Sequence, residues 1–234
     1  MSLPTLVTCS HGTASPEGSA AVARLTDAVR EAGDMPVVEA FVDVHGPFVD
    51  AVVRGLDGHA VVVPVLLAAG FHVRVDIAGA VAPFHEAVAA PALGPDPRII
   101  SMLLKRMATA GVRRGDHVVL ASAGSSDDMA DESVRQVARE LADAWGAPVT
   151  VAYGAAREPR VADEVSQFRK QEPGRRVAVV SYLLATGHFH RRLLGSGADV
   201  VTAPLLDHRE PDPRMVGLVL DRYAAARRTV RSAP

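Results

Sequence analysis

The sequence predicts an α/β protein made of two tandem, duplicated halves, each a doubly wound parallel sheet covered by helices, that face a central cleft. Two patterns support this prediction. Short valine-rich runs alternate with longer alanine-rich runs in which apolar residues recur every three or four positions, which is typical of buried parallel strands joined by helices. The same motifs then occur a second time in the same order, which indicates a duplication.

Three pairs of matching segments mark the duplication. They are 10–13 with 122–125, 63–70 with 180–187, and 95–98 with 211–214. The offsets within these pairs are 112, 117 and 116 residues, and chance does not account for three matches in order. A polar, glycine-flanked segment at 111–116 is typical of a connection between the two halves. We therefore expect a first half at 1–112, which carries the candidate active site, and a degenerate second half at 117–234.

The first half is expected to begin with a strand followed by a clearly delimited helix. Ser15 offers a hydroxyl N-cap, Pro16 occupies the first helical position, and Gly33 ends the helix. Asp96 and Pro97 open a later helix in the same way. In this half we expect strands at 5–9, 37–41, 60–67 and 88–93, and helices at 16–32, 76–85 and 97–110.

The second half is expected to repeat this alternation of strands and helices. Pro159 and Pro213 each open a helix, because proline is favoured in the first helical turn. In this half we expect strands at 117–121, 149–153, 176–184 and 200–203, and helices at 128–145, at 159–170, just after His190, and from 213 onward.

The composition narrows the class of protein. Hydrophobic residues make up 48% and charged residues 22% of the 234 residues, as in ordinary globular proteins. The net charge is −2 and the basic residues are scattered, so we expect no nucleic-acid partner. The N-terminus lacks a signal peptide, and no apolar run reaches the ~18 residues of a membrane span. We expect a cytoplasmic protein that does not contact a membrane.

Several functional motifs are missing from the sequence. The single cysteine, Cys9, can form neither an internal disulfide nor an iron–sulfur site, and reads as a small buried hydrophobe. There is no P-loop, no GxGxxG motif after a strand and no GxSxG motif. These absences argue against chemistry driven by nucleotides.

Three metal-competent side chains follow the first three predicted strands. His11 comes just after the first strand, Asp43 after the second and His72 after the third. Ligands of open parallel sheets bind at the carboxyl ends of the strands, so these side chains can converge. Imidazole and carboxylate together suit divalent iron, cobalt or nickel. The second half has Ala123 in place of His11. If the fold required a histidine at this position, both halves should have one.

The remaining histidines carry weaker signals. His188 and His190 lie near the place equivalent to His72, and we interpret them as remnants or as peripheral residues. The others lack a ligand-like spacing, and we expect them at the surface; they are His45, His59, His85, His117 and His208.

Three segments of the first half, 6–13, 61–77 and 93–98, together resemble the sirohydrochlorin chelatases of the CbiX and SirB type, whose fold is similar to that of the class II chelatases. The resemblance implies insertion of Co2+, Fe2+ or Ni2+ into sirohydrochlorin without ATP, as in the biosynthesis of sirohaem and cobalamin. It implies no cofactor beyond the metal substrate. Long, duplicated members replace a homodimer of short ones, which implies a monomer.

The resemblance also implies roles for individual residues. His11 and His72 would deliver the metal and accept pyrrole protons, with neutral imidazole serving as ligand and then as base. Asp43 stands where the family usually has a glutamate and would be a third metal ligand. Four further residues are expected to contact the macrocycle, namely Ser10, Gly70, Phe71 and Arg74.

Two other interpretations of the sequence stay open. A non-catalytic carrier of tetrapyrrole or metal would use the same cleft without turnover. A two-lobed, exported metal-binding protein would also carry histidines at strand ends, although no export signal supports it.

Overall fold

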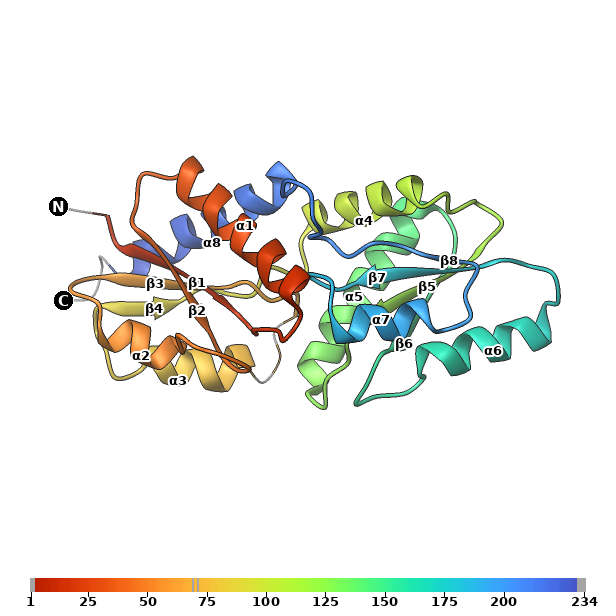
Figure 1. Ribbon diagram of the computed structural model, residues 1–234, viewed down its shortest axis with the longest axis horizontal. Coiled ribbons are helices and arrows are strands. Elements are labelled where there is room, and N and C mark those ends of the chain that lie inside the picture. The colour runs from red at the N-terminus through yellow and green to blue at the C-terminus, as the bar shows by residue number, and fades with distance from the viewer. Residues whose placement is uncertain (1–2, 69, 71, 231–234) are drawn as a thin grey trace. The chain divides into compact units, whose positions relative to one another are not determined.

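The protein forms two parallel sheets with helices on both faces, as predicted (Figure 1). The structure is a computed structural model that describes residues 3–68, 70 and 72–230, without the side chains of 72–74 and 230. Within these residues, each half of the chain supplies one four-stranded sheet. All of the strand pairs are parallel.

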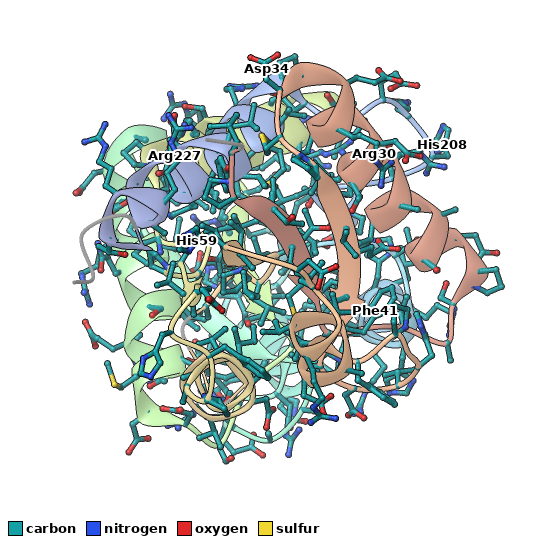
Figure 2. All side chains as sticks on the ribbon, turned by 90° about the vertical axis from the view of Figure 1, so that its left-hand side faces the viewer. Arg30, Asp34, Phe41, His59, His208 and Arg227 are labelled. Atoms are coloured by element: carbon teal, nitrogen blue, oxygen red, sulfur yellow. The ribbon has the colours of Figure 1, made fainter. Side chains whose placement is uncertain are left out.

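The first sheet has the strand order β2-β1-β3-β4. Its strands are β1 (Thr5–Ser10), β2 (Val37–Phe41), β3 (Ala60–Pro64) and β4 (Ala87–Ala89). The central strands are buried on both faces, which explains their continuous apolar runs. Figure 2 labels Asp34, which precedes β2, and Phe41, which ends it at the carboxyl edge of the sheet.

The second sheet repeats this topology with the order β6-β5-β7-β8. Its strands are β5 (His117–Ser122), β6 (Val149–Tyr153), β7 (Val177–Tyr182) and β8 (Val200–Val201). The same central position of the first strand in both sheets confirms that the chain is built from two copies of one unit.

The helices of the first half are α1 (Pro16–Ala32), α2 (Val49–Arg54), α3 (Ala78–Val81) and α4 (Pro97–Thr109), with a π-helix, η1 (His72–Ile77), before α3. The predicted cap of α1 is confirmed, because the Ser15 hydroxyl oxygen accepts a hydrogen bond from the backbone N–H of Gly18 at 3.3 Å. The helices of the second half are α5 (Asp128–Trp145), α6 (Val161–Gln171), α7 (His188–Leu194) and α8 (Pro213–Val230).

The last helix of each half packs on the sheet of the other half. One compact unit comprises Met1–Gly94 with His208–Pro234, and the other comprises Pro95–Asp207. In the first unit, α1 and α8 cover one face of the sheet, and α2 and α3 cover the other (Figure 1). The Tyr223 hydroxyl of α8 donates a hydrogen bond to the carbonyl oxygen of Pro4 at 2.6 Å.

In the second unit, α4 packs against α5 and β7. Arg106 of α4 forms an ion pair with Asp207 at 2.7 Å, which ties the helix to the end of this unit. The segment 111–116 therefore connects two elements of one unit. The compact units thus differ from the predicted halves, 1–112 and 117–234, because the apolar faces of α4 and α8 are buried in the opposite units.

Some elements of the first half differ from the prediction. The strand expected at 60–67 ends at Pro64, which has no N–H to donate toward β4, although the N–H of Val65 still donates to the carbonyl oxygen of Cys9 at 2.7 Å. The helix expected at 76–85 is replaced by η1 and the short α3. Helix α2 was not predicted, since it has only 6 residues and no side-chain cap. None of the described helices combines the length and the apolar character that a membrane crossing requires.

Candidate active site

The backbone holds His11 and Asp43 side by side at the carboxyl edge of the first sheet. The ladder between β1 and β2 continues beyond the ends of both strands. The N–H of Val42 donates to the carbonyl oxygen of Ser10 at 3.0 Å, and the N–H of Asp43 donates to that of His11 at 3.1 Å. The predicted proximity of His11 and Asp43 is therefore a direct consequence of strand pairing.

Gly12 fixes the turn that follows His11. Its φ is +87°, in the left-handed region that favours glycine. A Cβ at this position would lie 2.5 Å from the carbonyl oxygen of Asp43, far inside van der Waals contact. The glycine after His11 thus allows the β1 exit to pass close against the β2 exit.

The side chains of His11 and Asp43 are both exposed. The Nδ1 atom of His11 lies 3.3 Å from the Gly12 carbonyl oxygen, and because that oxygen can only accept, Nδ1 would be the donor in this contact. The Asp43 carboxylate accepts a hydrogen bond from the N–H of Val44 at 2.7 Å, which orients it.

The third predicted ligand, His72, lies at the start of η1. The side chains of His72 and Arg74, and the whole of Phe71, lie outside the described residues. Among the side chains that the structure describes, no group of three or more His, Cys, Asp or Glu residues could hold a metal ion. The convergence of His72 with His11 and Asp43 therefore stays a prediction, as do the roles of Phe71 and Arg74.

The repeat is irregular in the stretch that contains η1. The offset between the halves is 117 residues at 63–70 but 112 residues at β4, because Val61 pairs with Val88 as Ala178 pairs with Val200. The first half therefore has five more residues than the second between Gly70 and β4. The second-half counterpart of η1, α7, is an ordinary α-helix that begins just after Gly187. The extra residues therefore lie between Gly70 and β4, in the stretch that includes η1 and His72.

Three further residues lie near the strand ends of the first half. Cys9 and Ser10 are the last two residues of β1, and Gly70 follows β3 along the chain. Ser10 is buried, and its hydroxyl has no hydrogen-bond partner among the described residues. The N–H of Gly70 donates to the carbonyl oxygen of Ala68 at 3.0 Å. Burial, with the nearby charge of Asp76, raises the pKa of the Cys9 thiol to about 12. Cys9 is thus a buried thiol rather than a thiolate ligand, whereas contacts of Ser10 and Gly70 with a macrocycle stay predictions.

The second half reproduces the same backbone without the polar side chains. The N–H of Gly154 donates to the carbonyl oxygen of Ser122, and that of Ala155 donates to the carbonyl oxygen of Ala123, both at 2.8 Å. Ala123 thus matches His11, and Ala155 matches Asp43. The backbone of these exits therefore forms without a histidine or an aspartate. Applying the offset of 112 residues to Asp43 would have found Ala155 from the sequence.

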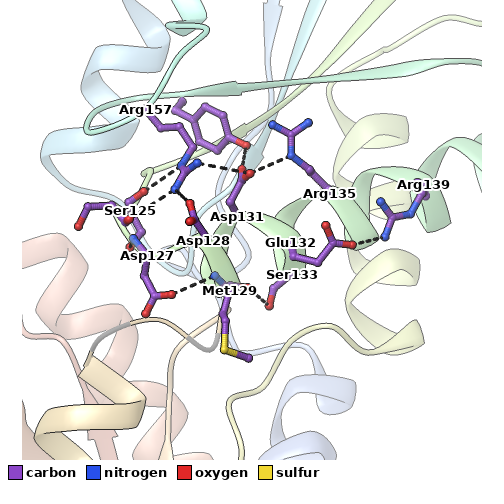
Figure 3. Close-up of polar contacts among 12 residues, drawn as sticks. Ser125, Asp127, Asp128, Met129, Asp131, Glu132, Ser133, Arg135, Arg139 and Arg157 are labelled. Atoms are coloured by element: carbon purple, nitrogen blue, oxygen red, sulfur yellow. Dashed lines mark hydrogen bonds and ion pairs between the residues drawn. The ribbon is translucent and has the colours of Figure 1, made fainter.

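A network of ion pairs occupies this edge in the second half (Figure 3). Arg157, which matches His45, pairs with Asp128 at 2.7 Å and donates to the carbonyl oxygen of Ser125 at 3.1 Å. Asp131 accepts hydrogen bonds from Tyr153 and Arg135. These bonds outweigh the opposing effect of burial and lower the pKa of Asp131. The polar groups here satisfy one another, which is typical of a structural role.

The other histidines divide into exposed and packed residues. His59, His85 and His208 are exposed as predicted, and Figure 2 labels two of them. The expectation was wrong for His117, whose side chain is only 14% exposed because it stacks on Phe168 with ring centroids 3.7 Å apart.

His190 is also packed in the second unit. Its Nε2 lies 3.2 Å from the carbonyl oxygen of Thr202, so the ring donates a hydrogen bond to β8's exit. Its neighbour His188 is exposed and lies edge-on to Phe189. The contact with Thr202 gives His190 a structural partner.

Burial lowers the pKa of both His117 and His190. Between the ordinary pKa of about 6.5 and these lowered values, the unfolded chain binds protons that the folded chain does not. We therefore expect stability to be full above about pH 6.5 and to fall as the pH drops below it. Urea unfolding at pH 7.5, 6.5 and 5.5 measures this loss. The double variant His117→Phe/His190→Gln should lose less stability, and an unchanged pH dependence would rule out the two histidines as its source.

The comparisons with known proteins agree with the sequence resemblance. The chain is similar to SirB from Bacillus subtilis with Fe3+, at 21% identity and a TM-score of 0.77 over 96% of this chain and 95% of that one. It is similar to the sirohydrochlorin chelatase SirB of Bacillus subtilis subspecies spizizenii in complex with cobalt, at 19% identity and a TM-score of 0.71 over 96% and 94% of the two chains.

A third similar structure is CbiX, described as the terminal enzyme for biosynthesis of siroheme in denitrifying bacteria, at 20% identity and a TM-score of 0.62 over 95% and 99% of the two chains. These likenesses confirm the predicted fold. None of the curated proteins matches the chain significantly. The family model described as CbiX matches residues 5–110 and again 117–226, and each match lies within one of the two predicted halves. The chain therefore belongs to the CbiX family.

Proposed function

We propose that the protein inserts Co2+ or Fe2+, and also Ni2+, into sirohydrochlorin without ATP, with His11 and Asp43 at the reacting centre. The observation that carries this proposal is the pairing of the two residues. Their exposed side chains leave adjacent strands joined by a hydrogen bond of 3.1 Å, while the same backbone in the second half bears Ala123 and Ala155. The polar pair is thus not needed to form the turn, and a role in chemistry accounts for it.

The chemistry requires bases as well as metal ligands. The metal-free macrocycle releases two pyrrole N–H protons as the divalent ion binds to its four nitrogens, so two proton acceptors must lie near the ring centre. An imidazole in its neutral form, such as that of His11, can first bind the metal through a ring nitrogen and then accept a proton. The Asp43 carboxylate supplies a hard oxygen ligand. His72 would be the second histidine, which accepts the other proton.

Related structures support this substrate class. Two similar proteins carry iron or cobalt, and one of them is a sirohydrochlorin chelatase by name. The three metals favour the same imidazole and carboxylate ligands. Selection among them would therefore depend on metal availability and coordination geometry rather than on the ligand types. The protein would act as a monomer and require no cofactor beyond the metal substrate.

Anaerobic mixing with sirohydrochlorin and each of Co2+, Fe2+ and Ni2+ tests the proposal. We expect the absorbance change of metal insertion to be faster with the protein than in buffer, and the initial rates rank the metals. A protein that binds the macrocycle yet inserts no metal faster than buffer would be a tetrapyrrole carrier. Failure to bind the macrocycle at all would exclude both functions.

A further inference from the structure

Val44, directly after Asp43, has an unusual backbone conformation. Its φ is +63°, in the left-handed region. The N–H of His45 donates to the carbonyl oxygen of Asp43 at 2.7 Å, which closes a tight three-residue turn around Val44. A β-branched residue in this region is an outlier, because its Cβ substituents crowd the backbone. The conformation therefore strains the protein at this residue.

The second half forms the same turn with a smaller residue. Ala156 matches Val44 and has a φ of +59°. The N–H of Arg157 donates to the carbonyl oxygen of Ala155 at 2.7 Å, as His45 does to Asp43. Alanine is therefore sufficient for the turn, and the valine side chain adds crowding that the backbone does not require.

Packing in the core does not offset this strain. Val44 is 49% exposed and is not among the buried hydrophobic residues of the core. Its position borders the site, since a Cβ placed at Gly12 would lie 3.2 Å from the Cβ of Val44. Val44 directly follows Asp43 and thus presents a rigid apolar group beside Gly12, the residue after His11. Residues with strained backbones are concentrated at active sites and ligand-binding positions.

We propose that the Val44 side chain contacts the face of the sirohydrochlorin ring and positions the macrocycle over His11 and Asp43. This inference rests on the proposed function. The centre of a tetrapyrrole is flat, conjugated and apolar, and its carboxylates are at the periphery. A stiff branched aliphatic group fits such a face, and burying it there recovers apolar area that is exposed in the unliganded protein. Val44 is therefore a positioning residue that determines affinity for the ring.

Val44→Ala tests this role, because it gives the turn the residue that the second half already has. We expect the dissociation constant for metal-free sirohydrochlorin, measured by absorbance titration, to rise by roughly 3- to 10-fold. KM should rise in parallel while kcat changes little. The urea midpoint should stay the same or increase, since the substitution relieves strain. A purely structural role predicts the reverse, with lower stability and unchanged affinity.

Two further variants complete the test. Val44→Thr keeps the branched shape but replaces one methyl group by a hydroxyl, and should weaken macrocycle binding without a gain in stability. Ala156→Val is the matched control, which adds the same crowding to the second half and should lower stability without affecting affinity. Wild-type affinity in both Val44 variants would overturn the inference and leave the proposed function intact, provided that the wild type inserts metal. If the wild type neither binds nor metallates the macrocycle, both proposals fail.

Discussion

Replacing His11 by alanine is expected to lower the initial rate of metal insertion by roughly 10²- to 10⁴-fold, the usual contribution of a positioned acid–base group. The imidazole would be lost both as a metal ligand and as an acceptor of a pyrrole proton. The fold should be preserved, since the equivalent turn in the second half has Ala123 and makes the same backbone hydrogen bond at 2.8 Å.

His59→Ala is the control for this prediction. His59 is also an exposed histidine of the first unit, but it precedes β3 at the opposite edge of the sheet. Its substitution should leave the rate of cobalt insertion unchanged. A His11→Ala protein that retains more than about a tenth of the wild-type rate would contradict the catalytic role of His11.

Gly124→Ala is expected to produce the largest loss of stability of any single substitution discussed. Gly124 has a φ of +93°, and a Cβ added there would overlap with the carbonyl oxygen of Ala155, which belongs to the backbone of the adjacent strand exit. Neither the left-handed conformation nor the overlap can be relieved by rotating a side chain. We expect a loss of about 4 kcal/mol or more in the free energy of unfolding, the range of severe substitutions, as measured by urea denaturation.

Gly174→Ala separates the two causes of this loss. Gly174 has a similar φ of +89°, but nothing lies within 4 Å of an added Cβ. This variant should lose only about 1 kcal/mol, which reflects the backbone conformation alone. Equal losses at positions 124 and 174 would show that the close approach of the strand exits is unimportant. Gly12→Ala should resemble Gly124→Ala, because its Cβ would lie 2.5 Å from the carbonyl oxygen of Asp43.

Local sequence signals predicted most elements of the fold. Strand 37–41 and helix 128–145 have the predicted bounds, because strong caps and continuous apolar patterns delimit them. The exchange of α4 and α8 between the compact units was not predicted. Each of these helices has an apolar face, but the apolar pattern alone does not say which sheet that face covers. Which sheet buries that face depends on tertiary contacts that a single sequence does not show.

The positions of site residues could be predicted from the sequence only where the order of the strands along the chain determines them. His11 and Asp43 follow paired parallel strands, so their proximity could be expected before the structure. The positive φ of Val44 could not, since valine rarely adopts it and nothing in the local sequence marks the turn. The packing of His117 on Phe168 likewise joins residues about fifty positions apart. Such contacts appear only once the helices are placed on their sheets.

The double variant His11→Ala/Asp43→Ala tests the central claim most directly, because it gives the first half the two alanines that the second half has at 123 and 155. The measurement is the initial rate of cobalt insertion into sirohydrochlorin, made on protein whose urea midpoint and macrocycle affinity match those of the wild type. We predict that insertion falls to the rate in buffer while both of those properties are unchanged. A folded, macrocycle-binding variant that still inserts cobalt at the wild-type rate would contradict the claim that His11 and Asp43 form the reacting centre.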